Sequence, residues 1–129
     1  MDTFTKTDSA IHPALTSLSD VEKMFGEAVR DFATSEIAPL VSQMDRKQEI
    51  EVDLIPQLFE LGLMGIEIPE EFGGAGSNFF TSVLIVEELS KTDPSVATLV
   101  DVQNTLVNNA ISRWASDELQ AHYFPKLAS

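Results

Sequence analysis

The amino-acid sequence predicts an all-α fold of about six helices. Apolar residues recur at intervals of three and four through most of the chain, which is the period of one helix face. Residues that favour helix N-termini precede several of these stretches. One apolar run, residues 78–92, is longer than an ordinary strand and contains no turn signal. With 129 residues, the chain can bury the core of a single domain.

Composition argues against several classes of function. The formal net charge of −13 opposes nucleic-acid binding, because a phosphate backbone would be repelled. The absence of cysteine excludes disulfides, thiolate chemistry and cysteine-based zinc sites, and fits a reducing compartment. No apolar run approaches the roughly 20 residues of a membrane span. The two histidines, His12 and His122, have no metal-ligand spacing, so we interpret both as surface residues.

Residues 1–16 are predicted to form a disordered N-terminal arm, and residues 17–129 the helical domain. The arm is polar and aperiodic, with Asp2 and Asp8 but only Lys6 as a base. A mitochondrial transit peptide would be rich in arginine and poor in acids, so none is visible. We expect either that the chain is not imported or that its presequence has been left off.

The first helix is expected to begin with the capping box of Ser19 and Glu22. Pro39 predicts a break near Ala38, followed by a second short helix that ends in the charged residues 45–51. The apolar stripe of the first helix consists of Val21, Met24, Phe25, Ala28, Val29 and Phe32.

A third, short helix is expected after Asp53, which can cap it. Pro56 falls in the first turn, where its missing N–H costs no helical hydrogen bond, and Gly62 lies where a helix is expected to end.

Residues 61–76, the glycine-rich segment, form the most punctuated part of the chain. Their apolar side chains need a surface, so we expect an ordered connection pressed against helices. Pro69 forbids helix continuation. Positive φ angles are open to its five glycines, Gly62, Gly65, Gly73, Gly74 and Gly76.

Residues 78–92 are apolar around most of a helical circumference, which predicts a central helix buried on nearly all sides. The β-branched residues would also suit a strand, but the length favours a helix. Glu87 and Glu88 would project about 100° apart and cannot face each other as an acid–base pair. We interpret them as charged residues at the end of this helix.

Asp93 and Pro94 predict the start of the longest helix, which runs to about Trp114. Asp101 and Gln103 interrupt its apolar side; they are either solvated, which we favour, or line a cavity. Trp114 is interpreted as a core or interface anchor. The expected apolar side consists of Val96, Leu99, Val100, Leu106, Val107, Ala110 and Ile111.

A last helix is predicted from Ser116, with Asp117 and Glu118 in its first turn and Pro125 near its end. Residues 74–79 resemble the start of a dinucleotide fingerprint, but the third glycine and a β-α-β context are missing. No pattern of residues nominates a catalytic group. Composition and spacing alone therefore predict an acidic helical domain.

Several blocks extend this interpretation, because they resemble the N-terminal domain of acyl-CoA dehydrogenases. Residues 65–74 (Gly-Ile-Glu-Ile-Pro-Glu-Glu-Phe-Gly-Gly) carry the main motif. Further blocks in the same order are residues 37–41, 62–65, 87–90 and 123–128. Residues 103–108 are most similar to short/branched-chain members of the family. Residues 115–120 depart from the usual Gly-Thr/Ser-Glu-Glu-Gln-Lys pattern.

The resemblance implies the helical N-terminal domain of an FAD enzyme that also has a β-barrel and a helical C-terminal domain. Such enzymes oxidise acyl-CoA to 2,3-enoyl-CoA and pass electrons to an electron-transfer flavoprotein. A homotetramer in the mitochondrial matrix is implied for the complete enzyme. The flavin-contacting strands and the catalytic glutamate would belong to the missing domains, so this chain is expected to be inactive alone.

Within the N-terminal domain, the resemblance implies that Thr98, Leu99 and Val102 form one wall of the acyl pocket. The alternative is that these are ordinary core residues. A second hypothesis for the whole chain is a stand-alone helical module that binds protein partners through exposed apolar residues.

Overall fold

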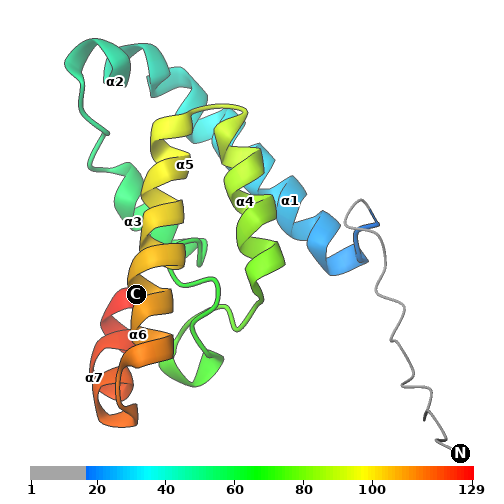
Figure 1. Ribbon diagram of the computed structural model, residues 1–129. Helices are drawn as coiled ribbons and strands as arrows, with labels where there is room; N and C mark the ends of the chain where they lie inside the picture. Colours follow the sequence, from blue (N-terminus) through cyan, green and yellow to red (C-terminus); the bar gives the residue numbers. More distant parts are fainter. Residues whose placement is uncertain (1–16) are drawn as a thin grey trace, which may run out of the picture.

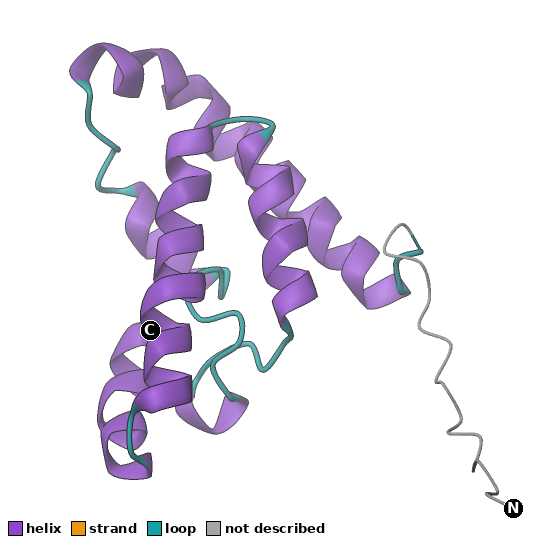
Figure 2. Cartoon of the chain, viewed as in Figure 1, coloured by secondary structure: helices purple, strands orange, loops and turns teal. Residues whose placement is uncertain are grey.

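The computed structural model describes residues 17–129, which are helical and contain no strand (Figure 2). Five continuous helical segments follow one another in this range, which confirms the predicted all-α fold. The arm predicted for residues 1–16 lies outside the described residues. No helix within residues 17–129 combines the length and apolar character needed to cross a membrane.

The first segment consists of α1 (Asp20–Phe32), the π-helical η1 (Ala33–Ile37), the 3-10 turn η2 (Ala38–Leu40) and α2 (Val41–Lys47). It begins with the predicted capping box. The Glu22 amide donates to Ser19 Oγ at 3.2 Å, and the Ser19 amide donates to Glu22 Oε2 at 2.7 Å.

The predicted break near Ala38 is a change of helix type. Pro39 has no N–H to donate, so α-helical pairing cannot run through it. The chain therefore passes through π and 3-10 geometry between Ala33 and Leu40, and then resumes as α2.

Helix α3 (Leu54–Glu60) ends as predicted, with Gly62 in a left-handed conformation at φ 71°. The prediction that Asp53 caps it was wrong, because the Asp53 side chain makes no capping hydrogen bond. Asp53 has helical rather than extended backbone angles (φ −67°, ψ −13°), which directs its carboxylate away from the first-turn amides.

Helices α4 (Phe79–Ser90) and α5 (Pro94–Asp101) pack side by side at the centre of the molecule, and α1 packs against α4 (Figure 1). Asp93 caps α5 as predicted, accepting from the amides of Ser95 and Val96 at 2.7 and 3.0 Å. The main core lies among these helices, α3 and the glycine-rich segment. Its fully buried members include Ile37, Leu54, Leu58, Leu63, Ile66, Ile85, Leu89, Val96 and Val100.

Helix α4 is less buried than predicted. Thr81, Ser82, Ile85 and Leu89 face inward, but the apolar residues Phe79 and Val83 lie on its exposed side. The expectation of burial on nearly all sides was therefore wrong, because helices cover only part of the α4 circumference in residues 17–129.

The longest helix runs continuously over residues 94–114, as α5, the π-helical η4 (Val102–Asn108) and α6 (Asn109–Trp114). Figure 1 shows these three elements in line. The predicted apolar side is correct for Val96, Leu99, Val100 and Ile111, which are buried or half-buried, but wrong for Leu106, Val107 and Ala110, which are exposed.

The physical reason for this error is that the inward positions of η4 are polar. Asn104 and Asn108 are buried and hydrogen-bond to the backbone of the glycine-rich segment. Trp114 is 86% exposed, so it is not a core anchor; the other interpretation, an interface anchor, stays a prediction.

Helix α7 (Asp117–Ala128) begins at Ser116, whose hydroxyl accepts from the Leu119 amide. A second, smaller core forms where α7 meets the glycine-rich segment and its 3-10 turn η3 (Glu70–Phe72). The rings of Phe72 and Phe124 lie 5.5 Å apart between centroids, beside buried Ile68 and Ala128.

The glycine-rich segment is ordered against helices, as predicted, but its glycines have two different roles. Gly62, Gly73 and Gly76 adopt positive φ. Gly65 and Gly74 do not use the positive φ that is open to them. Both permit close approach instead: a Cβ on Gly65 would lie 3.2 Å from Ala128 Cα, and one on Gly74 would overlap the Ile68 carbonyl oxygen.

We expect Gly74→Ala to lower the free energy of unfolding by about 3 kcal/mol, because the added methyl group overlaps backbone atoms that cannot move independently. Gly26→Ala is the matched control: no atom lies within 4 Å of a Cβ there, and alanine favours the helical backbone of α1 by about 0.5–1 kcal/mol. Urea denaturation of both variants measures the difference. Equal stability of the two would contradict the close-packing role of Gly74.

Candidate functional site

The three predicted pocket residues lie around the junction between α5 and η4. Thr98 is exposed, and its hydroxyl donates to the Pro94 carbonyl at 2.8 Å. Leu99 is half-buried and packs against the main core. Val102, the first residue of η4, is 41% exposed. Thr98 and Val102 thus share the exposed side of the helix, because residues four apart project in similar directions, while Leu99 turns toward the core.

Further apolar residues are exposed near this junction. These residues are Phe79 and Val83 of α4 and Val102 and Leu106 of η4. Leu106 is 62% and Phe79 55% exposed, which is high for large apolar residues. The sequence did not predict the exposure of Leu106, because the helical period of the apolar residues assigned Leu106 to the buried side.

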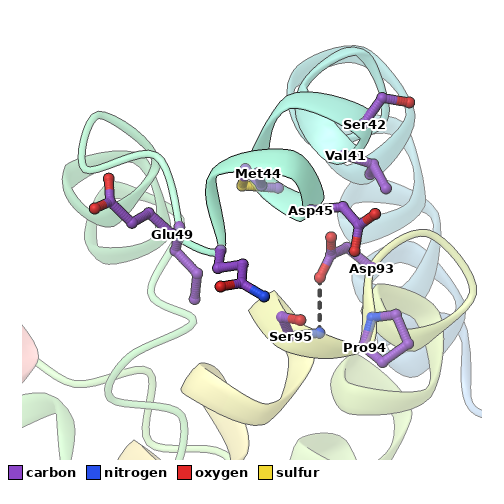
Figure 3. Close-up of a pocket in the computed structure, with 10 residues that line it drawn as sticks. Val41, Ser42, Met44, Asp45, Glu49, Asp93, Pro94 and Ser95 are labelled. Carbon is purple, nitrogen blue, oxygen red and sulfur yellow. Dashed lines mark hydrogen bonds between the residues drawn. The ribbon is translucent and has the colours of Figure 1, made fainter.

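A cavity of about 500 Å³ lies between α2 and the first turn of α5 (Figure 3). Three carboxylates line it, those of Asp45, Glu49 and Asp93, and none of its lining residues is basic. Asp93 is already engaged in capping α5, as Figure 3 shows for its bond to Ser95. Since carboxylates repel anions, this cavity is unsuited to phosphate groups, and it contains none of the predicted pocket residues.

A smaller cavity of about 110 Å³ lies between the glycine-rich segment, α6 and α7. Glu67, Ser77 and Asn108 are among its polar lining residues, and Phe124 closes one side. Pockets that hold cofactor-sized ligands enclose roughly 300 Å³ or more, so this cavity is of a size for water.

The backbone amides of residues 72–77, at the end of the glycine-rich segment, are already hydrogen-bonded. The amides of Gly74 and Gly76 donate to Pro69 O and Ile68 O at 3.2 and 2.9 Å, and the Ser77 amide donates to Ile66 O at 2.8 Å. A phosphate-binding loop needs amides that point at the ligand. The segment therefore offers no cradle for a dinucleotide pyrophosphate.

The buried asparagines join η4 to the glycine-rich segment. Asn104 Oδ1 accepts from the Ile66 amide at 3.0 Å, and Asn104 Nδ2 donates to Leu63 O at 2.8 Å. Asn108 Nδ2 donates to Met64 O at 2.8 Å. No buried side-chain polar atom in the described part of the chain lacks a partner, so this network is fully satisfied.

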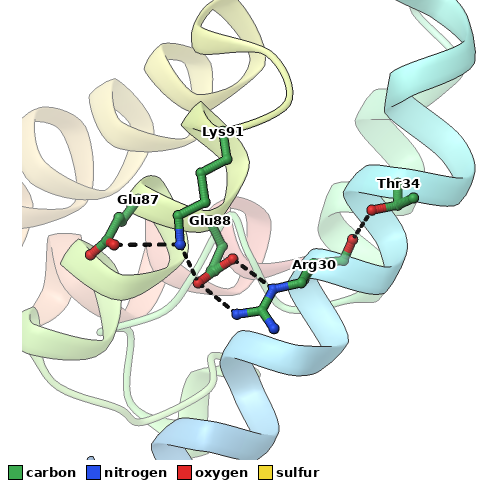
Figure 4. Close-up of polar contacts among 5 residues, drawn as sticks. All are labelled: Arg30, Thr34, Glu87, Glu88 and Lys91. Carbon is green, nitrogen blue, oxygen red and sulfur yellow. Dashed lines mark hydrogen bonds and ion pairs between the residues drawn. The ribbon is translucent and has the colours of Figure 1, made fainter.

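Four charged side chains form an ion cluster between α1 and α4 (Figure 4). Arg30 donates two hydrogen bonds to Glu88, at 3.0 and 3.1 Å, and Lys91 donates to Glu88 at 2.8 Å. The hydrogen bond from the Arg30 guanidinium is the main cause that lowers the pKa of Glu88, whereas partial burial opposes it. Glu87 reaches only Lys91, at 3.5 Å. Glu88 is thus a structural link and not half of a catalytic pair.

No group of histidine, aspartate or glutamate residues within residues 17–129 is arranged to hold a metal ion. His122 is exposed, as predicted, and its ring lies 4.9 Å from that of Tyr123. His12 lies outside the described residues.

The sequence and the fold both have known counterparts. Residues 19–129 match the sequence model of the family described as "Acyl-CoA dehydrogenase, N-terminal domain". The mitochondrial short/branched chain specific acyl-CoA dehydrogenase of Bos taurus is 48% identical over 115 residues, and the probable Dictyostelium discoideum enzyme of the same description is 43% identical over 126. These alignments cover 89% and 98% of this chain.

The butyryl-CoA dehydrogenase of Megasphaera elsdenii has a similar fold, with a TM-score of 0.80 and 29% sequence identity. That comparison covers 87% of this chain and 30% of the butyryl-CoA dehydrogenase chain. The two sequence relatives are likewise covered over only 27% and 30% of their lengths. This chain therefore spans less than a third of the length of each of these three proteins.

The ion cluster predicts a pH dependence of stability. The pKa of Glu88 is lower in the folded chain than its ordinary value of 4.5, so the carboxylate stabilises the fold above pH 4.5 and loses this effect as the pH falls through the folded pKa. We expect Glu88→Gln to be less stable than the wild type at neutral pH, with the difference shrinking below pH 4.5. Chemical denaturation over a pH series measures this difference.

Glu87→Gln is the matched control, because Glu87 is exposed and contacts Lys91 alone. It should change stability little at any pH. A destabilisation by Glu88→Gln that stays constant from neutral to acid pH would mean that the shape of the side chain, and not its charge, matters.

Proposed function

Since the chain belongs to the acyl-CoA dehydrogenase family through its N-terminal domain, we propose that it forms one wall of an acyl-CoA pocket in a complete enzyme of this family. Thr98, Leu99 and Val102 are the proposed wall residues. The complete enzyme would oxidise short or branched acyl-CoA thioesters to 2,3-enoyl-CoA, as its relatives' names suggest for the substrate class.

The observation that carries this proposal is the exposure of apolar residues at the junction of α5 and η4. Val102 and Leu106 face outward from a helix whose other side is buried, and Phe79 and Val83 are exposed on the neighbouring α4. Pocket walls are mostly apolar, and the free energy of the system falls when further protein or a ligand covers such side chains. Leu99 is half-buried and packs against the main core, so its size would determine how far the wall can move away from a bound acyl chain.

The proposed cofactor is FAD, which supplies hydride acceptance when bound. The residues described here do not fit its pyrophosphate, because the amides of the glycine-rich segment are engaged and the cavity beside α2 is lined by carboxylates. The contribution of this chain is therefore limited to substrate contact. Flavin binding and the catalytic carboxylate are assigned to other parts of the enzyme.

Partners and location follow from the same proposal. The complete enzyme would be a homotetramer that passes electrons to an electron-transfer flavoprotein in the mitochondrial matrix. The Bos taurus relative carries "mitochondrial" in its description, which supports this location.

A second candidate function is a stand-alone helical module that binds a protein partner. The exposure of Phe79, Leu106 and Trp114 favours it, because large apolar side chains in contact with water promote association. The intact mass of the native polypeptide separates the two proposals. A mass near 14.2 kDa would favour the module, and a mass several times larger the enzyme domain.

The wall is tested by Leu99→Phe in the complete enzyme. The larger ring would push the helix surface toward the acyl chain, so preference should move toward shorter acyl groups. We expect the ratio of kcat/KM for butyryl-CoA over octanoyl-CoA to rise about tenfold. Leu119→Phe, the same substitution at an exposed position of α7, is the control and should leave the ratio unchanged. An unchanged ratio in a folded Leu99→Phe enzyme would reject the wall.

A further inference from the structure

The π-helical element η4 has no local cause in its own sequence. The other π-helical stretch, η1, precedes Pro39, which forces a departure from α-helical pairing. Residues 102–108 contain neither proline nor glycine, and no proline follows until Pro125. Since the sequence of η4 contains no helix breaker, we attribute its π-helical pairing to side-chain contacts. Such pairing is rare and is frequently found at functional sites.

Side chains satisfy the backbone where η4 begins. Asn104 Nδ2 donates to Val100 O at 2.9 Å, and Thr105 Oγ1 donates to Asp101 O at 2.9 Å. Both acceptors are carbonyls four residues earlier, at the point where pairing changes from four to five residues. Such a change leaves carbonyls short of a backbone donor, so these two side chains stabilise the junction.

Only Asn104 also fixes the junction to another part of the protein. It is 1% exposed, and the hydrogen bonds of its side-chain amide with Ile66 N and Leu63 O hold η4 against the glycine-rich segment. Thr105 is half-buried, and its hydroxyl bonds within the helix. Asn104 therefore fixes the rotation of the long helix near the start of η4, and Asn108, four residues later, holds the same side of the helix to Met64 O.

That rotation determines where the proposed wall residues point. Successive helical residues turn by about 100°, so side chains two positions apart project to nearly opposite sides. With Asn104 held inward, Val102 must face outward, as its exposure indicates. Thr98, four residues before Val102, shares its outward side.

We infer that Asn104 is a positioning residue for acyl specificity, which holds the Thr98–Val102 side of the long helix toward the acyl chain by fixing η4 to the glycine-rich segment. This inference rests on the proposed function. Asn104 itself is buried and contacts no substrate; it acts through Val102 and Thr98.

The test replaces Asn104 in the complete, flavin-loaded enzyme. Asn104→Leu keeps the branched outline of the side chain but removes all four of its hydrogen bonds, and Asn104→Asp keeps the acceptor for the Ile66 amide but loses the amide donor. Thr105→Val is the matched control, because it removes a bond to a carbonyl four residues earlier without touching the glycine-rich segment. The readouts are the ratio of kcat/KM for butyryl-CoA over octanoyl-CoA and hydrogen exchange of the Ile66 amide.

For Asn104→Leu we expect a change of about fivefold in the ratio and faster exchange at Ile66, with a change below about twofold in the Thr105→Val ratio. If Asn104→Leu does not fold, Asn104→Asp is expected to change the ratio in the same direction by a smaller factor. Faster exchange with an unaltered ratio in a folded Asn104 variant would overturn the inference, because Asn104 would then be structural only.

The Leu99→Phe enzyme separates the two proposals in the same assay. If Leu99→Phe changes the ratio and neither Asn104 variant does, the wall stands and the positioning role is rejected. If none of the three changes it, the wall itself is rejected, and the positioning role with it.

Discussion

The structure depends on one buried amide. Asn104 lies in the long helix, and its side-chain amide bonds to three backbone groups, two of them in the glycine-rich segment, and to the Asn108 side chain. A backbone without regular structure can be buried only if its polar groups find partners, and this side chain supplies partners for Ile66 and Leu63. The main core closes around that contact, since Leu63 and Ile66 bring their own side chains into it. An apolar residue at position 104 would leave both groups unpaired in the interior.

Two different forces therefore hold the two sides of the molecule. Between α1 and α4, apolar packing is supplemented by the Arg30–Glu88 ion pair at the surface, where water and salt weaken it. Between η4 and the glycine-rich segment, neutral hydrogen bonds between buried groups fix the register. The first arrangement tolerates small shifts of one helix against the other, whereas the second specifies a single alignment. The proposed substrate wall lies on the helix that is held in the second way.

The sequence was sufficient to predict the helices, because caps and proline act locally. Ser19, Asp93 and Ser116 begin helices where the pattern indicated, and the residues that carry the family motif form the ordered segment that was expected. What failed depended on contacts from distant parts of the chain. The inward position of Asn104 is set by carbonyl and amide groups some forty residues earlier, and a helical period derived from apolar residues alone turned Leu106 inward instead. The polar Asn104 and Asn108, four residues apart, were the signal available for the buried side of η4.

The last helix gives the smaller core an order of assembly. Ala128 packs against Gly65 with so little space that a Cβ on the glycine would lie 3.3 Å from the Ala128 methyl carbon, and Phe124 packs on Phe72. Both partners come later in the chain than the glycine-rich segment, because they belong to α7. Without α7, the Ile68 and Phe72 side chains lose Phe124 and Ala128 and retain Ile111 of α6 as a helical neighbour, whereas no residue of α7 belongs to the main core around Leu63 and Ile66. The main core can therefore form without α7, and the smaller core is complete only when α7 has docked.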